Sequence, residues 1–297
     1  MRATGDGRPR EHEALLGALV DDQLRAVRCV EQAADALVAA AEAVADALRK
    51  GGRLIYLGAG ASGCIAIQDG AELPGTFGLD IESVAFVSPG GDPFGALVGS
   101  GGEDDEEDAR AALDTLALRE GDLVLAVSAS GSTPFTLAGA RAAKARGARL
   151  VSIACRPGAP LFEGADVSVL LATGPEAVDG STRLGAGTAQ KAALGVISTL
   201  ACAKLGHVHR GMMVNLRPDN AKLRARATGI VARLADVDQA TAAAALEHTQ
   251  FDVKAAIVAA AGRLDAEAAK ALVADCGGDL AAALERTQRG AKFQTRA

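Results

Sequence analysis

The chain has 297 residues, a formal net charge of −6, 49% hydrophobic residues and only 3% aromatic residues. This composition is typical of a folded globular protein with an aliphatic core rich in alanine and glycine. The acidic balance argues against a broad nucleic-acid-binding surface, but it allows local positive potential for a small anionic substrate.

The cysteines and the N-terminus indicate a cytoplasmic protein. The five cysteines are scattered and form no C-x-x-C pair, so we expect reduced thiols. The first residues contain no apolar segment typical of a signal peptide, and no apolar run reaches the roughly 20 residues of a membrane span. We expect no association with a membrane.

Helices and strands alternate along most of the chain. Residues 1–10 are polar and expected to be mobile, and residues 13–50 predict two helices that end at Gly51-Gly52. A long apolar helix is expected over Thr188–Leu205, and a short strand or turn over Val214–Leu216. Five short apolar runs predict strands: Leu54–Leu57, Ser83–Val87, Leu123–Val127, Leu150–Ala154 and Val167–Leu171. The pattern predicts an α/β fold with a doubly wound parallel sheet flanked by helices.

The last part of the chain has a different pattern. Residues 245–257 and 271–284 are rough copies of each other, each with a helix, a polar turn and an aspartate that opens a second helix. Asp252 and Asp279 are therefore expected to be N-caps. We predict an N-terminal helical segment (1–50), an α/β domain (51–232) and a small helical domain (233–297).

A glycine-rich turn follows the first predicted strand, in the sequence LIYLGAGASG (54–63). Gly58, Gly60 and Gly63 remove side chains where backbone N–H groups would approach an anion, and the helix that follows adds positive dipole character. The G-x-G-x-x-G spacing alone is a weak dinucleotide-binding signal and is also compatible with a simple tight turn.

A second turn, in LVLAVSASGST (123–133), is rich in hydroxyl groups and precedes a helix-like run over 135–146. Hydroxyls and backbone amides bind a phosphate monoester well without a fixed positive charge. Thr133 before Pro134 could instead be an N-cap. Two such turns at strand ends predict a sugar phosphate lying across the carboxyl edge of the sheet.

Four separated motifs carry a family resemblance. GPEAVDGSTRLGAGTAQK (174–191), LIYLGAGASG, DGAELPGTFG (69–78) and MVNLRPDNAKLRARA (213–227) together resemble the N-acetylmuramic acid 6-phosphate etherases, which belong to the sugar isomerase (SIS) domain superfamily. The resemblance extends from about Gly51 to the C-terminus. It implies an SIS sugar-phosphate-binding domain over 51–232, a UBA-like helical domain over 233–297 and a homodimer.

The resemblance also implies an activity. These etherases cleave the D-lactyl ether of N-acetylmuramic acid 6-phosphate and yield N-acetylglucosamine 6-phosphate and D-lactate by elimination and then hydration, without a metal or other cofactor. Glu103 matches the base that removes the C2 proton, and Glu72 matches the acid that protonates the departing lactate oxygen. Partial burial near Leu73, Pro74 and Phe77 would keep Glu72 protonated.

Other matched positions are implied to contact the substrate or its phosphate. Glu176 could equally cap its own loop, Lys191 could be an ordinary surface residue, and runs of acidic residues such as the one around Glu103 are usually solvated. The full set is Gly60, Ala61, Ser62, Gly63, Ser128, Ser130, Gly131, Ser132, Thr133, Glu176, Ser181, Thr182 and Lys191.

The chain departs from the family pattern at several positions. Ala61 replaces a threonine, and Cys64, Ser132 and Gly185 stand where a positively charged residue is usual. Each lost charge-assisted contact to a doubly anionic substrate would cost on the order of 1.5–3 kcal/mol. Arg183, Lys191 and Arg217 are the remaining candidate cations.

We therefore predict a lyase of amino-sugar metabolism that acts in peptidoglycan recycling, with no nucleic-acid partner. One alternative is a non-catalytic sugar-phosphate-binding regulator like the glucokinase regulatory protein, which shares this resemblance. Another is an NAD-binding Rossmann protein, with Asp80 or Glu82 as the ribose-binding acid. The serine-rich second turn argues against the Rossmann alternative.

Overall fold

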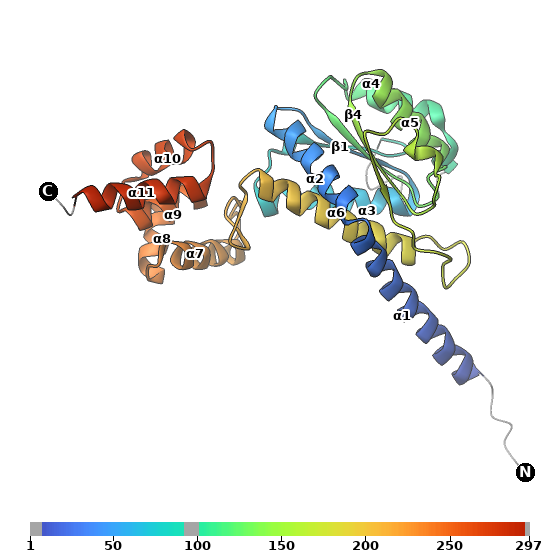
Figure 1. Ribbon diagram of the computed structural model, residues 1–297, viewed down its shortest axis with the longest axis horizontal. Helices are drawn as coiled ribbons and strands as arrows, with labels where there is room; N and C mark the ends of the chain where they lie inside the picture. The colour runs from blue at the N-terminus through green and yellow to red at the C-terminus, as the bar shows by residue number, and fades with distance from the viewer. Residues whose placement is uncertain (1–7, 92–100, 295–297) are drawn as a thin grey trace, which may run out of the picture. The chain divides into compact units, whose positions relative to one another are not determined.

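The structure, a computed structural model, describes residues 8–91 and 101–294 (Figure 1). The chain divides into two compact units. The first comprises residues up to Ala71 together with Glu82–Ser198, and the second comprises Glu72–Ile81 together with residues from Thr199 onward. The predicted boundary between residues 232 and 233 falls inside a helix of the second unit, Ala221–Ala235.

A five-stranded parallel sheet forms the centre of the first unit. The sheet has the order β2-β1-β3-β4-β5, which confirms the predicted doubly wound parallel sheet. Each predicted strand agrees with the structure to within one residue at each end. The strands are β1 (Leu54–Gly58), β2 (Val84–Val87), β3 (Leu123–Val127), β4 (Arg149–Ala154) and β5 (Val167–Leu170).

Helices cover both faces of this sheet (Figure 1). Helices α4 and α5 lie on one face and α2 on the other. The bounds are α1 (Arg8–Gln32), α2 (Ala34–Arg49), α3 (Gly60–Phe77), α4 (Glu106–Thr115), α5 (Pro134–Ala145) and α6 (Gly185–Lys204), with short 3-10 helices at Ile81–Ser83, Gly101–Asp104 and Pro160–Phe162. Helix α1 begins inside the segment expected to be mobile, and residues 1–7 of that segment lie outside the described residues. Helix α6 begins three residues before its predicted start.

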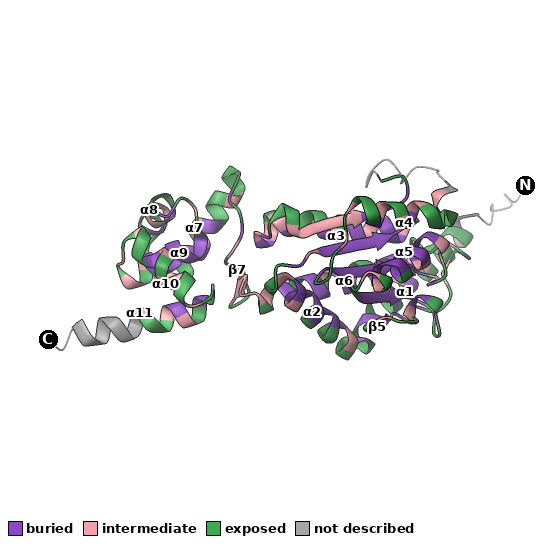
Figure 2. Ribbon diagram, turned by 90° about the horizontal axis from the view of Figure 1, so that it is seen from above, coloured by how far each residue is buried: buried purple, intermediate pink, exposed green. Residues whose placement is uncertain are grey.

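The central strands β1 and β3 are apolar because both faces of the sheet are covered. Every residue of these two strands is buried, and Figure 2 shows purple, buried strands between the helices of this unit. Ile55 and Leu57 pack in one cluster with Phe135 of α5. A methyl group on Gly139 would lie 2.9 Å from the side chain of Leu57, so this position in α5 needs a residue without a side chain.

The order in which the chain adds strands to the sheet changes direction between β1 and β3. From β1 it builds β2 on one side and then returns to place β3 on the other. The register pairs Gly58 with Val127, so the turns that follow β1 and β3 leave the sheet at the same level. Ligands of open α/β sheets bind at such a switch point, outside the carboxyl ends of the strands.

Two glycines of the first turn serve helix–strand packing. A methyl group on Gly63 would lie 2.7 Å from the carbonyl oxygen of Gly58, and one on Gly58 would lie 3.0 Å from the carbonyl oxygen of Val127. Gly58 and Gly63 therefore have a packing role besides the one expected for them near an anion. Gly60 differs, because its φ of +55° is a conformation that glycine adopts without strain.

The second unit is helical apart from a two-stranded antiparallel hairpin, β6 (Val208–His209) with β7 (Met212–Met213). The predicted short strand or turn at 214–216 follows this hairpin, and Val214 and Leu216 are buried. The remaining elements are α7 (Ala221–Ala235), α8 (Gln239–His248), α9 (Val253–Gly262), α10 (Ala266–Asp275) and α11 (Leu280–Gln294).

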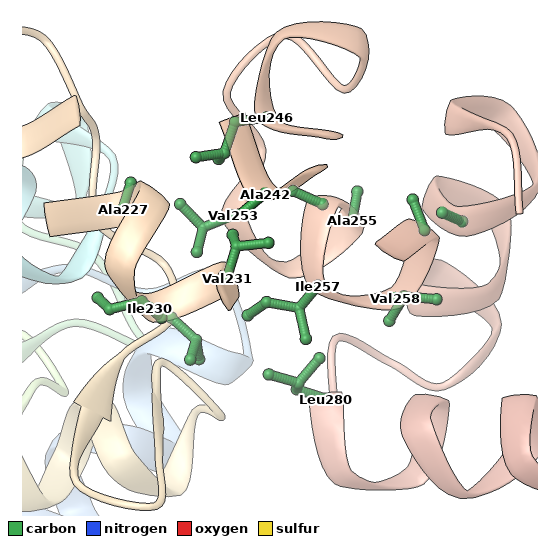
Figure 3. Packing of buried hydrophobic residues seen from close by; sticks show 14 of the residues in the cluster. Ala227, Ile230, Val231, Ala242, Leu246, Val253, Ala255, Ile257, Val258 and Leu280 are labelled. Carbon is green, nitrogen blue, oxygen red and sulfur yellow. The ribbon is translucent and has the colours of Figure 1, made fainter. Parts of the chain in front are cut away.

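The helices of the second unit share one apolar core. Figure 3 shows side chains of α7, including Ile230 and Val231, packed with Leu246 of α8 and Ile257 of α9. The predicted caps are confirmed, because the Asp252 carboxylate accepts a hydrogen bond from the Ala255 amide at 2.9 Å and that of Asp279 from the Ala281 amide at 2.8 Å. None of the described helices is both long enough and apolar enough to cross a bilayer.

We predict that Gly63→Ala destabilises the protein by about 1–3 kcal/mol, because the added methyl group pushes α3 away from β1. The measurement is the free energy of unfolding in urea. Gly75→Ala in the same helix is the matched control, since a methyl group there meets no atom within 4 Å. Equal stability of the two variants would contradict the packing role of Gly63.

Candidate functional site

The serine-rich turn after β3 forms a hydrogen-bonded network of its own. The hydroxyl of Ser128 lies 2.9 Å from that of Thr133 and accepts a hydrogen bond from the Gly131 amide at 3.1 Å. Both the amide and the hydroxyl of Ser132 donate to the Ser130 hydroxyl, at 3.1 and 3.0 Å. The turn is therefore ordered by its own hydroxyl groups.

The contacts of Thr133 show whether its hydroxyl only caps α5 or belongs to the hydroxyl network of the turn. It stands at the N-cap position of α5, yet its side chain makes no capping hydrogen bond. Its hydroxyl bonds to Ser128 instead. A residue needed only to begin the helix would bond to the amides of the first helical turn. The hydroxyl therefore belongs to the serine network.

Ser62 connects the two turns. Its side chain is 8% exposed, and its hydroxyl accepts a hydrogen bond from the Ala129 amide at 3.2 Å. Gly60 and Ala61, which precede it, are partly exposed. The first turn of α3, with its unpaired amides, therefore lies beside the serine turn. This arrangement favours an anion at the site.

The carboxylate of Glu103 lies against this first turn. A methyl group on Gly60 would overlap the Oε1 atom of Glu103, so the glycine leaves the space that the carboxylate occupies. The negative charge of Glu103 also affects the pKa of the Cys64 thiol. Burial raises its pKa, a backbone hydrogen bond lowers it, and the negative charge of Glu103 raises it further. Glu103 is thus placed at the switch point of the sheet.

The acidic neighbours of Glu103 have structural partners. Asp105 caps α4 by accepting hydrogen bonds from the amides of Glu107 and Asp108, each at 3.0 Å. Glu106 pairs with Arg110 at 2.6 Å. Asp105 and Glu106 therefore serve helix capping and a surface ion pair. Glu103 differs from them because its carboxylate lies against Gly60.

Glu72 lies near the other end of α3 and begins the segment that belongs to the second unit. It follows Gly60 by twelve residues, which corresponds to about 18 Å along a helix. Its side chain is exposed, in contrast to the partial burial expected for it. The reason is helical periodicity, because Leu73 and Phe77 take the buried side of the helix.

Glu176 caps α6. Its two carboxylate oxygens accept hydrogen bonds from the amides of Gly185 at 2.7 Å and Ala186 at 3.0 Å. The guanidinium of Arg25 holds the start of the same loop, donating to the carbonyls of Thr173 at 3.2 Å and Pro175 at 3.0 Å. Glu176 therefore has a capping role, but it caps the start of α6 and not its own loop as the sequence alternative suggested.

The other residues of this region that were predicted to contact the substrate are more exposed than Glu176 or partly exposed like it. Ser181 is partly exposed and Thr182 exposed in the loop before α6, and Lys191 is exposed on the second turn of that helix. Asp22, which no sequence motif indicated, is buried against Gly185. A methyl group at Gly185 would lie 2.8 Å from the Asp22 carboxylate, so the glycine leaves room for this side chain.

The described residues contain no cluster of three or more side chains arranged to hold a metal ion. His207 is partly buried in the second unit, and this burial, with the positive charge of Lys254, lowers its pKa to about 4. Its imidazole is therefore neutral at pH 7.

The fold and the site define a class of protein. A five-stranded parallel sheet with a hydroxyl-rich turn at its switch point agrees with the SIS domain expected from the sequence, and residues 21–155 match the family model described as "SIS domain".

The relatives narrow this class. The chain is 43% identical over 246 residues to the N-acetylmuramic acid 6-phosphate etherase of Deinococcus radiodurans, covering 83% of this chain and 81% of the relative. It is 39% identical over 267 residues to that of Cronobacter sakazakii, covering 89% of each. The chain belongs to the N-acetylmuramic acid 6-phosphate etherase family. A solved phosphoheptose isomerase from Neisseria gonorrhoeae aligns with a TM-score of 0.46 and 18% identity, covering 65% of this chain and 97% of that one.

We predict that Glu176→Ala destabilises the protein by about 1–2 kcal/mol, because it removes the cap of α6. Urea unfolding measures the change, and Glu163→Ala, an exposed glutamate on the β4–β5 connection, is the control. A Glu176→Ala variant of unchanged stability but weakened substrate binding would instead assign this carboxylate to the substrate.

Proposed function

We propose that this protein is a cytoplasmic lyase that cleaves the D-lactyl ether of N-acetylmuramic acid 6-phosphate in peptidoglycan recycling. The observation that carries the proposal is the Glu103 carboxylate at the glycine turn, beside the serine turn, in a chain of the etherase family. No cofactor is required, because the open-chain aldehyde of the sugar itself acidifies the C2 proton.

The proposed reaction assigns separate tasks to the turns and to Glu103. The serine turn and the first amides of α3 hold the 6-phosphate. The exposed Glu103 carboxylate removes the C2 proton, and the electron pair forms the C2–C3 double bond as the C3–O bond to lactate breaks. Water then adds at C3, and the proton returns to C2. The products are N-acetylglucosamine 6-phosphate and D-lactate.

Glu72 is proposed as the acid that protonates the departing lactate oxygen. Glu72 is exposed in the single chain, near the opposite end of α3 from Gly60. We therefore propose that the site is completed in a homodimer, in which Glu72 of a second copy approaches Glu103.

An apolar stripe on α1 supports association of two copies. Leu16, Val20, Leu24 and Val27 recur at spacings of four, four and three residues and so lie on one face of the helix. They are 62%, 49%, 52% and 52% exposed. Exposed apolar residues gathered in this way mark a protein interface more often than a solvated surface.

We predict that Glu103→Gln and Glu72→Gln each lower D-lactate release from N-acetylmuramic acid 6-phosphate by roughly 100- to 10,000-fold, because each removes one proton-transfer group. The assay follows D-lactate with time, and Glu120→Gln, an exposed glutamate before β3, is the control. A wild-type protein that is stabilised by sugar phosphates but releases no lactate would be a binding regulator instead.

The composite site makes a second prediction. Mixing the two inactive variants and allowing subunits to exchange should restore roughly a quarter of the wild-type activity, because about half of the dimers carry one intact site. Leu16→Asp combined with Leu24→Asp should yield monomers by light scattering and abolish this recovery, whereas Glu13→Ala combined with Arg28→Ala should not. Failure of the mixed variants to recover activity would exclude a site shared between copies.

A further inference from the structure

Cys155 and Arg156 directly follow β4, the strand next to β3, and lie beside the serine turn that follows β3. The ladder between β3 and β4 continues past the strands, with the Ser128 amide donating to Ile153 at 3.1 Å and the Cys155 amide to Ala129 at 2.9 Å. Arg156 comes next, one residue beyond the last of these hydrogen bonds. Neighbouring strands lie about 4.8 Å apart, so the Arg156 backbone begins close to Ala129, at the start of the serine turn.

The backbone on both sides of Arg156 is fixed against this turn. The Leu161 amide donates to the Gly131 carbonyl at 3.0 Å, and a methyl group on Gly131 would overlap the side chain of Ala159. On the N-terminal side of Arg156, Cys155 is hydrogen-bonded to Ala129. On its C-terminal side, Ala159 and Leu161 contact Gly131. The arginine therefore projects from a connection whose position relative to Ser128–Thr133 is set by the fold.

The cations of the first unit are unevenly distributed. At the amino edge of the sheet, Arg53 pairs with Asp122 at 2.6 Å, and Lys144 pairs with Asp166 at 2.9 Å. Arg156 lies at the carboxyl edge, is exposed, and forms no ion pair or side-chain hydrogen bond within 8–91 and 101–294. It is a cation at the substrate edge that no structural contact explains.

The site needs such a charge. The side chains of the serine turn contribute only uncharged hydroxyls, and the Glu103 carboxylate adds a negative charge close to where the phosphate would bind. A guanidinium matches phosphate geometry with paired donors and stays charged at every working pH. We propose that Arg156 is a specificity-determining residue that binds the 6-phosphate from the neighbouring strand, an inference that rests on the proposed function.

The test compares Arg156→Gln and Arg156→Lys with Arg141→Gln, a substitution of an exposed arginine in the middle of α5. Loss of one charge-assisted hydrogen bond to phosphate corresponds to an increase of roughly 10- to 100-fold in KM for N-acetylmuramic acid 6-phosphate, and kcat should change little. The lysine variant should recover part of the loss. Inhibition by inorganic phosphate should weaken by a similar factor in Arg156→Gln only.

The outcomes separate this inference from the proposed function. If wild-type protein releases no D-lactate, the proposed function fails, and the inference is still tested by stabilisation with inorganic phosphate in a thermal unfolding assay. If wild-type protein is active but Arg156→Gln keeps its KM and its inhibition by phosphate, Arg156 does not bind the substrate. Equal changes in Arg156→Gln and Arg141→Gln would indicate a general surface-charge effect and would also overturn the inference.

Discussion

The parallel pairing of β1 with β3 is the constraint on which the site depends. The two strands are far apart in sequence, yet their register brings Gly58 opposite Val127. The turn after each strand therefore leaves the sheet beside the other. The hydrogen bond from the Ala129 amide to Ser62 is the direct consequence, and it joins the glycine turn to the serine turn.

Small residues make this pairing possible. Helix α3 must begin directly against β1 if its first amides are to face the serine turn, and Gly63 against Gly58 allows that approach. Gly139 gives α5 the same proximity to Leu57. A protein with few aromatic residues can thus build a dense core from close backbone contacts and aliphatic side chains. In the first turn, Gly58 and Gly63 allow this close packing, and Gly60 leaves the space that the Glu103 carboxylate occupies.

Charge is arranged differently at the two edges of the sheet. At the amino edge, Asp122 is fully buried. Burial alone would raise its pKa, but hydrogen bonds from the Arg53 side chain and from backbone amides hold the pKa below its ordinary value. Its ionised form is therefore part of the folded structure. The carboxyl edge instead has hydroxyls and amides, with Glu103 and Arg156 exposed. One edge therefore contains the largely buried Arg53–Asp122 ion pair, whereas the other presents exposed polar and charged groups.

The sequence by itself determined the parallel α/β architecture, the strand positions, the two turns and the caps at Asp252 and Asp279, because these follow from local patterns of apolar, glycine and capping residues. Its motifs also indicated the family. Tertiary structure decided what the local pattern left open. It assigned Glu176 to the start of α6, directed the Thr133 hydroxyl to Ser128, left Glu72 exposed and placed Arg156 directly after the Cys155 amide that bonds to Ala129. These outcomes depend on strand order and helix packing between distant segments, which no local spacing encodes.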